Sequence, residues 1–326
     1  MRAYIIGRLL LFIPIVLVVS FIIFGLVSLM PGDAIDAMLA MSGAEEQLDR
    51  AMVERALGLD APFLVRYGRW MGVVPQEGGN FSGIFQGDLG ITWRERIPLV
   101  ERIAKAFPVT LELGLMGIII AQLIALPIGV YSALRQDKWG DYIGRSFAIG
   151  CVSFPSFWLG TMIIVYPSIW WGYMPPIMLI HLTEDPIGNL QMFIVPALLL
   201  GMALGGMTMR MMRTMMLEVL RQDYIRTAWA KGLKERVVIL RHALKNALIP
   251  VITVIGFQVP ILIGGTVIIE EIFCLPGMGR LLISGVNFRD QPLVSGVLVV
   301  FSVVMVLTNL MVDLTYGYLD PRIRYK

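Results

Sequence analysis

The chain has 326 residues, of which 57% are hydrophobic and 16% are charged, and it carries a formal net charge of +3. Soluble domains contain about 25% charged residues, so this composition and a mean hydropathy of +0.75 exclude an ordinary soluble globular protein. The basic residues stand beside the apolar segments, which favours a role in membrane orientation over one in nucleic-acid binding.

Six apolar segments are long enough to cross a bilayer, whose hydrocarbon core requires roughly 20 residues of helix. These predicted spans are Leu9–Met30, Val109–Leu134, Ser146–Tyr173, Met192–Met209, Ala247–Phe273 and Leu293–Val312. The apolar run of the first span is longer than the roughly 7–15 residues of a signal-peptide core, so we expect it to be retained as a helix. The sequence thus predicts an all-α integral membrane protein with six transmembrane helices.

Lysine and arginine are unevenly distributed between the loops that connect the spans. The loop 210–246 holds nine Lys and Arg residues against three Asp and Glu, whereas the loop Met174–Gln191 has no Lys or Arg. Because short cytoplasmic loops accumulate Lys and Arg, the loop 210–246 is expected in the cytoplasm. Basic residues also lie before the first span and in the tail, so both termini are expected to face the cytoplasm.

The segment between the first two spans, Pro31–Pro108, is far longer than any other external loop. Its aromatic and aliphatic residues recur in a helical rhythm, at Leu57, Phe63, Leu64, Tyr67, Trp70 and Met71. Glu77–Asn80 is expected to form a tight turn or a flexible tip, and Leu99–Phe107 an amphipathic stretch before the second span. The sequence predicts a small extracytoplasmic cap here, and a folded loop that merely covers helix ends is the alternative.

The predicted domain organisation follows from these segments. The first part, 1–30, is the N-terminal tail with the first transmembrane helix, and the second part, 31–108, is the extracytoplasmic cap. The third part, 109–326, is the core transmembrane domain, which includes the cytoplasmic loop 210–246. The sequence has no internal repeat with the period of a solenoid.

Small and helix-breaking residues are frequent in the fourth and fifth spans. Gly201, Gly205 and Gly206 permit close approach of helices to the fourth span. Pro250 and Pro260 remove backbone donors from the fifth span and are expected to kink it. We therefore expect the fifth span to line a pathway or form a gate, with ordinary packing as the alternative for any one position. The candidate pathway residues are Gln258, Pro260, Gly264 and Gly265.

Ionisable residues are missing from the middle of every predicted span. Glu112, Glu270, Glu271 and Asp313 all lie near span ends, where we expect water to reach them. Proton-coupled carriers usually place a titrating carboxylate or histidine within the membrane. A carrier of this kind is therefore disfavoured, while a sodium site built from carbonyl groups remains open.

The sequence does not indicate a catalytic or metal-binding site. The two histidines, His181 and His242, lie in loops on opposite sides of the predicted membrane, so they cannot share a metal or a triad. Cys151 and Cys274 are expected to be structural. No Gly-x-x-x-x-Gly-Lys-Ser/Thr motif is present, so the chain cannot hold ATP in a P-loop, and any ATPase must be a separate polypeptide.

The loop 210–246 contains an apolar stripe at helical spacing, formed by Met216, Leu217, Leu220, Tyr224 and Ala228. Gly232 follows as an expected helix C-cap, and a second helix, Glu235–Ala247, leads into the fifth span. A helix of this kind suits the groove of a partner protein, but a basic helix lying on anionic headgroups has the same pattern. Periodicity alone leaves both interpretations open.

The same loop resembles part of a known family. Asp223–Pro250 resembles the cytoplasmic EAA loop of prokaryotic ABC importer permeases, and Tyr224–Leu233 is similar to the version found in peptide permeases. Further matching motifs are Gly87–Gly90, Pro108–Leu113, Arg241–Ala247, Glu271–Phe273, Leu275–Arg280 and Leu319–Arg322. Arg226 replaces the glutamate that names the loop and Thr227 replaces its first alanine, so residue roles from other importer families are not transferred.

The resemblance implies a permease subunit with the six-helix fold of type I ABC importers, an extracytoplasmic insertion between helices 1 and 2, and no enzymatic activity of its own. The implied partners are a second homologous permease, two cytoplasmic ABC ATPases, an extracytoplasmic solute-binding protein and membrane lipid, but no nucleic acid. ATP and magnesium are expected on the ATPases, with no cofactor or metal on this chain. The implied location is the prokaryotic plasma (inner) membrane.

The resemblance also identifies residues expected to contact an ATPase and to couple its closure to the spans. They are Leu220, Asp223, Tyr224, Arg226, Thr227, Ala228, Lys231 and Gly232. Gly232 would set the turn, and Tyr224 and Ala228 would form the apolar ridge. Arg226 and Lys231 would supply charge-assisted contacts.

Among solutes, the resemblance favours dipeptides or oligopeptides that a binding protein delivers. The same subfamily also serves nickel chelates, glutathione, opines and oligosaccharides, and these stay open as alternatives. Outside this class, the alternatives are an ion-coupled secondary carrier, which needs no ATPase, and a membrane scaffold or receptor, which shows no flux.

Overall fold

The computed structural model describes residues 2–30, 60–76, 78–174, 176 and 178–319 of the chain. Within these residues the regular structure is helical, apart from one isolated bridge between Ile91 and Pro98. Five of the described helices are long and apolar enough to cross a membrane, and a bent pair of helices makes a sixth span if it is counted as one. These helices agree with the predicted all-α membrane fold.

The chain divides into two compact units. The large unit consists of Thr110–Leu275 together with the chain from Leu307 onward, and the small unit consists of Arg2–Val109 and Pro276–Val306. The division falls inside two continuous helices, α5 (Leu99–Leu134) and α13 (Gln291–Leu319).

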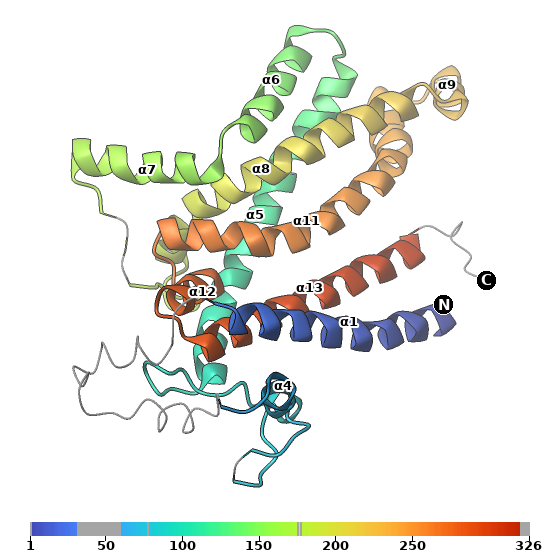
Figure 1. Ribbon diagram of the computed structural model, residues 1–326. Coiled ribbons are helices and arrows are strands. Elements are labelled where there is room, and N and C mark those ends of the chain that lie inside the picture. Colours follow the sequence, from blue (N-terminus) through green and yellow to red (C-terminus); the bar gives the residue numbers. More distant parts are fainter. Residues whose placement is uncertain (1, 31–59, 77, 175, 177, 320–326) are drawn as a thin grey trace. The chain divides into compact units, whose positions relative to one another are not determined.

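The large unit is built around α8 (Pro186–Leu220), which packs against α6 (Trp139–Ser153) and α11 (Leu244–Ile272), as Figure 1 shows. The start of α8 is fixed by Asp185, whose carboxylate accepts hydrogen bonds from two backbone N–H groups of the first turn. α8 has 35 residues and extends beyond both ends of the predicted span Met192–Met209. A helix of this length crosses the hydrocarbon core and continues into the polar region beyond it.

Glycine residues let α8 approach its neighbours closely, as the sequence predicts. A Cβ atom at Gly201 would stand 2.7 Å from the carbonyl oxygen of Gly117 on α5. A Cβ atom at Gly206 would stand 2.8 Å from the carbonyl oxygen of Ala148 on α6. Both distances are shorter than real Cβ contacts, so any larger residue at these positions requires a shift of the backbone.

The third predicted span, Ser146–Tyr173, is not one continuous helix. It is divided between α6 and α7 (Ser156–Trp171), which are bent by 88° relative to each other. The break falls at Phe154, whose backbone is extended, with φ −90° and ψ 127°, and which precedes Pro155. A proline disfavours helical backbone in the residue before it, so the helix ends here although the hydropathy of the segment continues. The prediction of one unbroken span is wrong at this point.

Short elements connect α8 to α11. They are α9 (Asp223–Ala230), α10 (Glu235–Val237) and η2 (Val238–Ala243), a π-helical turn that runs directly into α11. The predicted helix that begins at Glu235 and leads into the fifth span is confirmed. α11 continues through Pro250 and Pro260, and its ribbon is bent in Figure 1.

The small unit contains α1 (Arg2–Ser28), α4 (Phe63–Met71), a 3₁₀ turn η1 (Ile84–Gln86), α12 (Met278–Asn287) and the adjoining ends of α5 and α13. The predicted helical rhythm around Tyr67 is confirmed by α4, whose aromatic rings pack against Phe21 and Phe24 of α1. Leu57 lies outside the described residues. A second set of buried residues joins α5, α12 and α13, and it consists of Leu99, Ile103, Ala106, Met278, Leu293 and Val297.

Two features of the predicted cap are now resolved. The tight turn before Asn80 is confirmed, because Gly79 has a φ of 79° and the N–H of Gln76 donates to the carbonyl of Asn80 at 2.9 Å. The predicted amphipathic stretch Leu99–Phe107 is confirmed, because Leu99, Ile103 and Ala106 are buried whereas Glu101 and Lys105 are exposed; it forms the first turns of α5, which continues through Pro108 without interruption. A proline is tolerated inside a membrane helix where neighbouring groups satisfy the freed carbonyl.

Glu270 corrects an expectation about the span ends. Its side chain is fully buried, and its carboxylate accepts a 2.6 Å hydrogen bond from the hydroxyl of Thr110 on α5. The expectation that water reaches this carboxylate is therefore wrong, because the last turns of α11 direct it into the chain. Its neighbour Glu271 is exposed, as expected for a residue turned about 100° further around the helix. The side chain of Asp313 is outside the described part.

Candidate functional site

The candidate functional site is α9 and the turn that follows it. α9 begins after Gln222 and carries Asp223 in its first turn, where a negative charge is favourable beside the N–H groups of the helix start. After Ala230 the chain turns at Gly232, whose φ of 74° lies in the left-handed region. The N–H of Gly232 donates to the carbonyl of Trp229 at 2.9 Å. The predicted glycine stop is confirmed.

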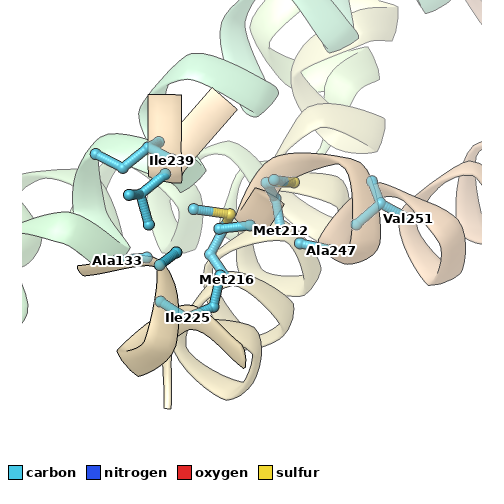
Figure 2. Close-up of a cluster of buried hydrophobic side chains, with 10 residues drawn as sticks. Ala133, Met212, Met216, Ile225, Ile239, Ala247 and Val251 are labelled. Carbon is cyan, nitrogen blue, oxygen red and sulfur yellow. The ribbon is translucent and has the colours of Figure 1, made fainter. Parts of the chain in front are cut away.

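The inner face of α9 is part of a buried apolar cluster (Figure 2). The cluster consists of Ala133, Met212, Met216, Ile225, Ala228, Val238, Ile239, Ala243, Ala247 and Val251. α9 contributes Ile225, which is 1% exposed, and Ala228, which is 7% exposed. Full burial of an isoleucine side chain contributes about 1.5–3 kcal/mol. The cluster therefore attaches α9 to α8, η2 and α11 within the same chain.

This attachment corrects the predicted apolar stripe. The stripe does not lie on one helix, because α8 ends at Leu220 and α9 starts at Asp223 after a turn. Tyr224 is 44% exposed, whereas Ala228 is covered by its own chain. Ala228 therefore does not form part of an exposed ridge. Helical spacing identifies an apolar face, but it does not say which protein covers that face.

The outer face of α9, as we name it, is exposed. It is formed by Asp223, Tyr224, Arg226, Thr227, Trp229, Lys231 and Gly232. Six of the eight predicted contact residues lie on it; the other two, Leu220 and Ala228, pack in or against the buried cluster. Asp223 and Arg226 approach to 3.4 Å, but their side chains are 96% and 75% exposed, so the pair adds little stability and both groups stay accessible.

A hydrogen bond links the outer face to the membrane helix that follows. The side-chain amide of Asn246, near the start of α11, donates to the hydroxyl of Tyr224 at 2.9 Å. The same amide donates to the backbone carbonyl of His242 in η2 at 3.0 Å. The Tyr224 ring is therefore exposed on one side and fixed to α11 through its hydroxyl.

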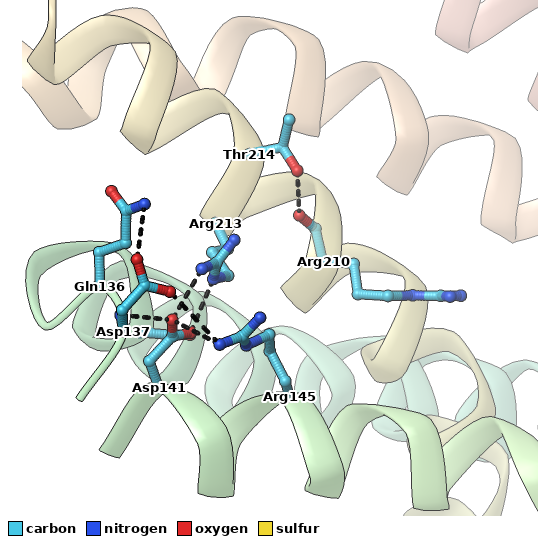
Figure 3. A network of polar contacts seen from close by, with 8 residues as sticks. Gln136, Asp137, Asp141, Arg145, Arg210, Arg213 and Thr214 are labelled. Carbon is cyan, nitrogen blue, oxygen red and sulfur yellow. Dashed lines mark hydrogen bonds and ion pairs between the residues drawn. The ribbon is translucent and has the colours of Figure 1, made fainter. Parts of the chain in front are cut away.

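A buried ion-pair network fixes the second half of α8 to α6 (Figure 3). The carboxylate of Asp141 is fully buried and accepts two hydrogen bonds of 2.7 Å from the guanidinium of Arg213. Arg145 approaches the same carboxylate to 3.2 Å, and the hydroxyl of Ser132 on α5 donates to it. Bidentate arginine–carboxylate pairs are among the strongest polar contacts. Sequence reasoning missed this network, because the basic residues were used only to orient the spans.

Two of the candidate pathway residues on α11 face the interior of the chain. Gln258 is 1% exposed, and its amide donates to the carbonyl of Leu204 at 3.1 Å and to the hydroxyl of Thr208 at 2.8 Å, both on α8. A Cβ atom at Gly265 would lie 3.0 Å from the side chain of Leu200. Both residues therefore belong to the contact between α11 and α8.

The other two candidates are more accessible. A Cβ atom at Gly264 would meet open space, and Pro260 is partly exposed. Phe257, Ile261 and Ile268 are 57%, 59% and 45% exposed. Together with Gly264 they follow helical spacing along α11, and we name this set the open face of α11.

Spanning helices that hold a short, exposed helix on a polar loop are the arrangement expected of a permease subunit. The chain belongs to the family described as the binding-protein-dependent transport system inner membrane component, which matches residues 125–325. The N-terminal region of such membrane components matches residues 1–114. The predicted family is confirmed, and the chain is a membrane permease subunit of an ABC importer rather than its ATPase.

Named relatives are similar along their whole length. A peptide transport system permease protein of Brucella abortus (strain 2308) is 38% identical over 325 residues, which cover 100% of both chains. The glutathione transport system permease protein GsiC of Salmonella paratyphi A is 36% identical over 326 residues, again with 100% coverage of both. The likeness thus includes the region between the first two spans as well as the helical core.

A solved structure shares the fold. The crystal structure of an amino acid ABC transporter with histidines matches 67% of this chain and 94% of its own chain, with a TM-score of 0.51 and 12% sequence identity. At this identity the likeness concerns the fold alone. The predicted all-α membrane fold of the type I importer permeases is confirmed.

Proposed function

We propose that this permease subunit carries peptides across the membrane, and that the outer face of α9 is the surface on which a partner ATPase docks. The observation that carries the docking proposal is the division of α9 into a buried face and an exposed face. A docking helix needs both, because it must reach the partner and must also transmit the motion of the partner. The peptide solute is supported by the full-length similarity to a permease named for peptide transport.

Two kinds of contact would transmit the motion of α9 to α11. Ile225 and Ala228 pack with residues of η2, and the hydroxyl of Tyr224 accepts the hydrogen bond from Asn246. Packed interiors are dense and do not yield to small displacements. A push on the outer face of α9 therefore displaces η2 and the start of α11 together.

The open face of α11 is the part of this chain that we assign to the translocation pathway. It presents Phe257, Ile261 and Ile268, with Gly264 between them where a solute or a partner helix can approach closely. Gln258 and Gly265 would then act by holding α11 to α8 rather than by touching the solute. A second, homologous permease would supply the other half of the pathway.

The complete transporter in this proposal also contains two cytoplasmic ATPases and an extracytoplasmic solute-binding protein. ATP and magnesium bind to the ATPases. The excess of Lys and Arg in the loop 210–246 and near both termini supports a cytoplasmic position for the docking helix and for the chain ends. Closure of the ATPases on ATP shifts the population between inward-open and outward-open states, since ATP binds the two states with different affinity.

Affinity purification of the tagged chain from its native membrane in mild detergent tests the assembly. Mass spectrometry is expected to identify a second six-span permease and two ATPases with P-loop motifs. Recovery of the chain alone, with transport intact after reconstitution, would contradict the proposed partners.

Substitutions on the outer face test the docking surface. Gly232→Asp adds a charge and strains a left-handed position, and Arg226→Glu reverses an exposed charge. Both are expected to lower ATPase recovery and ATP-driven uptake at least about tenfold, the effect of roughly 1.4 kcal/mol. The matched control is Arg135→Glu, which reverses an exposed charge in the loop after α5 and is expected to leave both readouts unchanged. Normal uptake by a well-inserted Gly232→Asp variant would contradict the docking role.

The solute is tested in proteoliposomes that contain the purified transporter and its binding protein. Radiolabelled dipeptides and oligopeptides are expected to accumulate when ATP is present. Glutathione, an oligosaccharide and a nickel chelate serve as competitors. Accumulation of one of these in place of peptides would leave the importer assignment intact but overturn the peptide assignment.

A further inference from the structure

A pocket of about 390 Å³ lies within the small unit, among α1, α4, the loop before α5 and the start of α13. Its volume falls in the range of about 300–1,000 Å³ that is common for small-molecule sites. The walls are fixed by side chain to backbone hydrogen bonds. The amide of Gln76 donates to the carbonyls of Arg69 and Ser82, at 3.1 and 2.8 Å. The pocket is thus a formed feature of the unit.

The pocket lies at the level where two spans leave the hydrocarbon core. Its lining includes Ser28, the last residue of the span in α1, and Gln291, the first residue of the span in α13. Trp70 and Trp93 also line it, and tryptophan is typical of the boundary between lipid tails and headgroups. The buried carboxylate of Asp290 accepts the N–H of Trp93 at 2.9 Å, which fixes this wall to the start of α13.

The charge of the lining is positive. Arg66, Arg69 and Arg96 line the pocket, and Asp88 is its acidic residue. The carboxylate of Asp88 already accepts hydrogen bonds from Ser82 and from the backbone of the same loop. Arg66 and Arg96 form no ion pair with any residue that the structure describes. Two guanidinium groups are therefore available to a ligand.

The Arg66 guanidinium lies 5.9 Å from the ring centroid of Phe24 and has no acidic partner among the described residues. Partial burial lowers the pKa of the Arg66 guanidinium, as expected for a charge that has lost water and gained no counter-charge. The indole N–H of Trp70 is buried and has no acceptor among the described residues. An anion that carries several oxygen atoms would satisfy the arginines and this donor together.

The lining of the pocket combines arginine residues with apolar residues of the membrane span. Phe24 and Val27 are apolar lining residues of α1, and Phe24 lies about one turn deeper in the span than Ser28. A small inorganic anion would leave these apolar residues uncovered. A phospholipid matches both kinds of residue, because its phosphate lies at the boundary and its acyl chains enter the hydrocarbon region.

From this arrangement we propose that the pocket binds the phosphate headgroup of an anionic phospholipid, with Arg66 and Arg96 on the phosphate and Phe24 against the first part of the acyl chains. An acidic side chain of a partner protein would satisfy the arginines but would leave the apolar residues uncovered. The bound lipid would fix the loop before α5 to the membrane surface.

Native mass spectrometry of the transporter, purified from its membrane with its accompanying subunits, tests the site. The probes are phosphatidylglycerol, phosphatidylcholine and inorganic phosphate, added separately to delipidated protein. The wild type is expected to retain phosphatidylglycerol in preference to the other two. Since a membrane-surface arginine is worth roughly one kilocalorie per mole, Arg66→Gln should weaken phosphatidylglycerol binding about fivefold and the double variant with Arg96→Gln about 25-fold.

Two further variants test whether weaker lipid retention comes from the pocket itself rather than from misfolding or from the loss of any positive charge. Arg102→Gln removes a positive charge from the same unit outside the pocket, where Arg102 pairs with Glu95, and it should leave lipid retention unchanged. Trp70→Phe keeps an aromatic ring but removes the unpartnered N–H together with the five-membered part of the indole, so it should weaken retention about threefold.

The proposal is overturned if the double variant binds phosphatidylglycerol as the wild type does, or if phosphatidylcholine binds as tightly. If inorganic phosphate binds with the same affinity as phosphatidylglycerol, the ligand of the pocket is a free anion and the lipid proposal is wrong. Weakened capture of the solute-binding protein by the double variant, with lipid retention unchanged, would instead assign the arginines to a protein contact.

Discussion

The helices α8 and α11 pack against each other, yet they differ sharply in how much of each the chain itself covers. In the most apolar stretch of α8, 67% of the residues are buried, whereas in the corresponding stretch of Glu235–Ile272 only 22% are. Both segments have the length and hydropathy of a membrane span. The difference teaches that hydropathy identifies a segment that avoids water, but it does not say whether the same chain or another molecule packs against that segment. α8 is the internal support of the large unit, whereas the open face of α11 stays largely exposed.

The largest effect is expected where α8 is fixed to α6. Asp141→Asn leaves Arg213 with only 17% of its side chain exposed and without its main counter-charge, so the free energy of unfolding should fall by about 3 kcal/mol. Denaturant unfolding of the purified subunit in detergent measures this change. The control is Asp137→Asn, whose carboxylate is 63% exposed and which should change stability by less than about 0.5 kcal/mol. Equal effects of the two variants would refute the special role of the buried pair.

Glycine substitutions on the two helices sharpen the comparison further. Gly201→Ala forces α8 away from α5 and should cost about 1–3 kcal/mol. Gly264→Ala places its methyl group in open space and should stabilise α11 by up to about 1 kcal/mol, because alanine favours helix. Denaturant unfolding of both variants measures these two changes in stability. A loss of stability at Gly264 as large as that at Gly201 would mean that the chain itself covers the open face.

The polar contact between the two helices should have an intermediate effect. Gln258→Leu removes the amide that reaches Leu204 and Thr208 on α8, and it should cost about 1–2 kcal/mol, since polar groups in the buried contact lose their partner. Thr253→Val is the control, because the hydroxyl of Thr253 bonds only within α11, to Ile249. A change below about 0.5 kcal/mol for both variants would show that apolar packing alone joins the helices.

The smallest effect on stability is expected at α9. Tyr224→Phe removes one partly exposed hydrogen bond to Asn246 and should cost about 0.5–1 kcal/mol. Its clearer consequence should be in coupling, with about half the solute transported per ATP hydrolysed in proteoliposomes. Tyr142→Phe removes a hydroxyl from another exposed tyrosine, on α6, and should leave this ratio unchanged. An unchanged ratio in both variants would show that the cluster around Ile225 transmits motion unaided.

Much of the fold could be predicted, because the strongest signals act locally along the chain. Hydropathy located the spans, the left-handed position of Gly232 followed from its place after a helical pattern, and the small residues of α8 indicated close packing. The break between α6 and α7 also had a local signal in Pro155. Continuous hydropathy on both sides outweighed that signal in the prediction.

The remainder depends on contacts between distant residues. Nothing near Asp141 in the sequence indicates Arg213, which lies 72 positions away. The burial of Ala228 likewise depends on η2 and α8. The spacing of the loop residues therefore identified the apolar face, but it did not show that the same chain, rather than a partner protein, packs against Ala228. Glu270 was misplaced for the same reason, because its position near a span end did not reveal the hydroxyl of Thr110 beside it.

The π-helical turn η2 has a consequence for rotation about the helix axis. The fully buried residues Val238 and Ala243 are five positions apart, while Ala243, Ala247 and Val251 follow at intervals of four. In an α-helix a step of five would point a side chain about 140° away from its predecessor. The wider turn absorbs the extra residue and keeps the buried residues aligned. η2 thus sets the phase between α9 and α11. Deletion of one residue within it would leave Val238 and Ala243 four positions apart, the spacing that places them on one side of an ordinary α-helix, so the π-helical turn would no longer be needed to keep the two elements in phase.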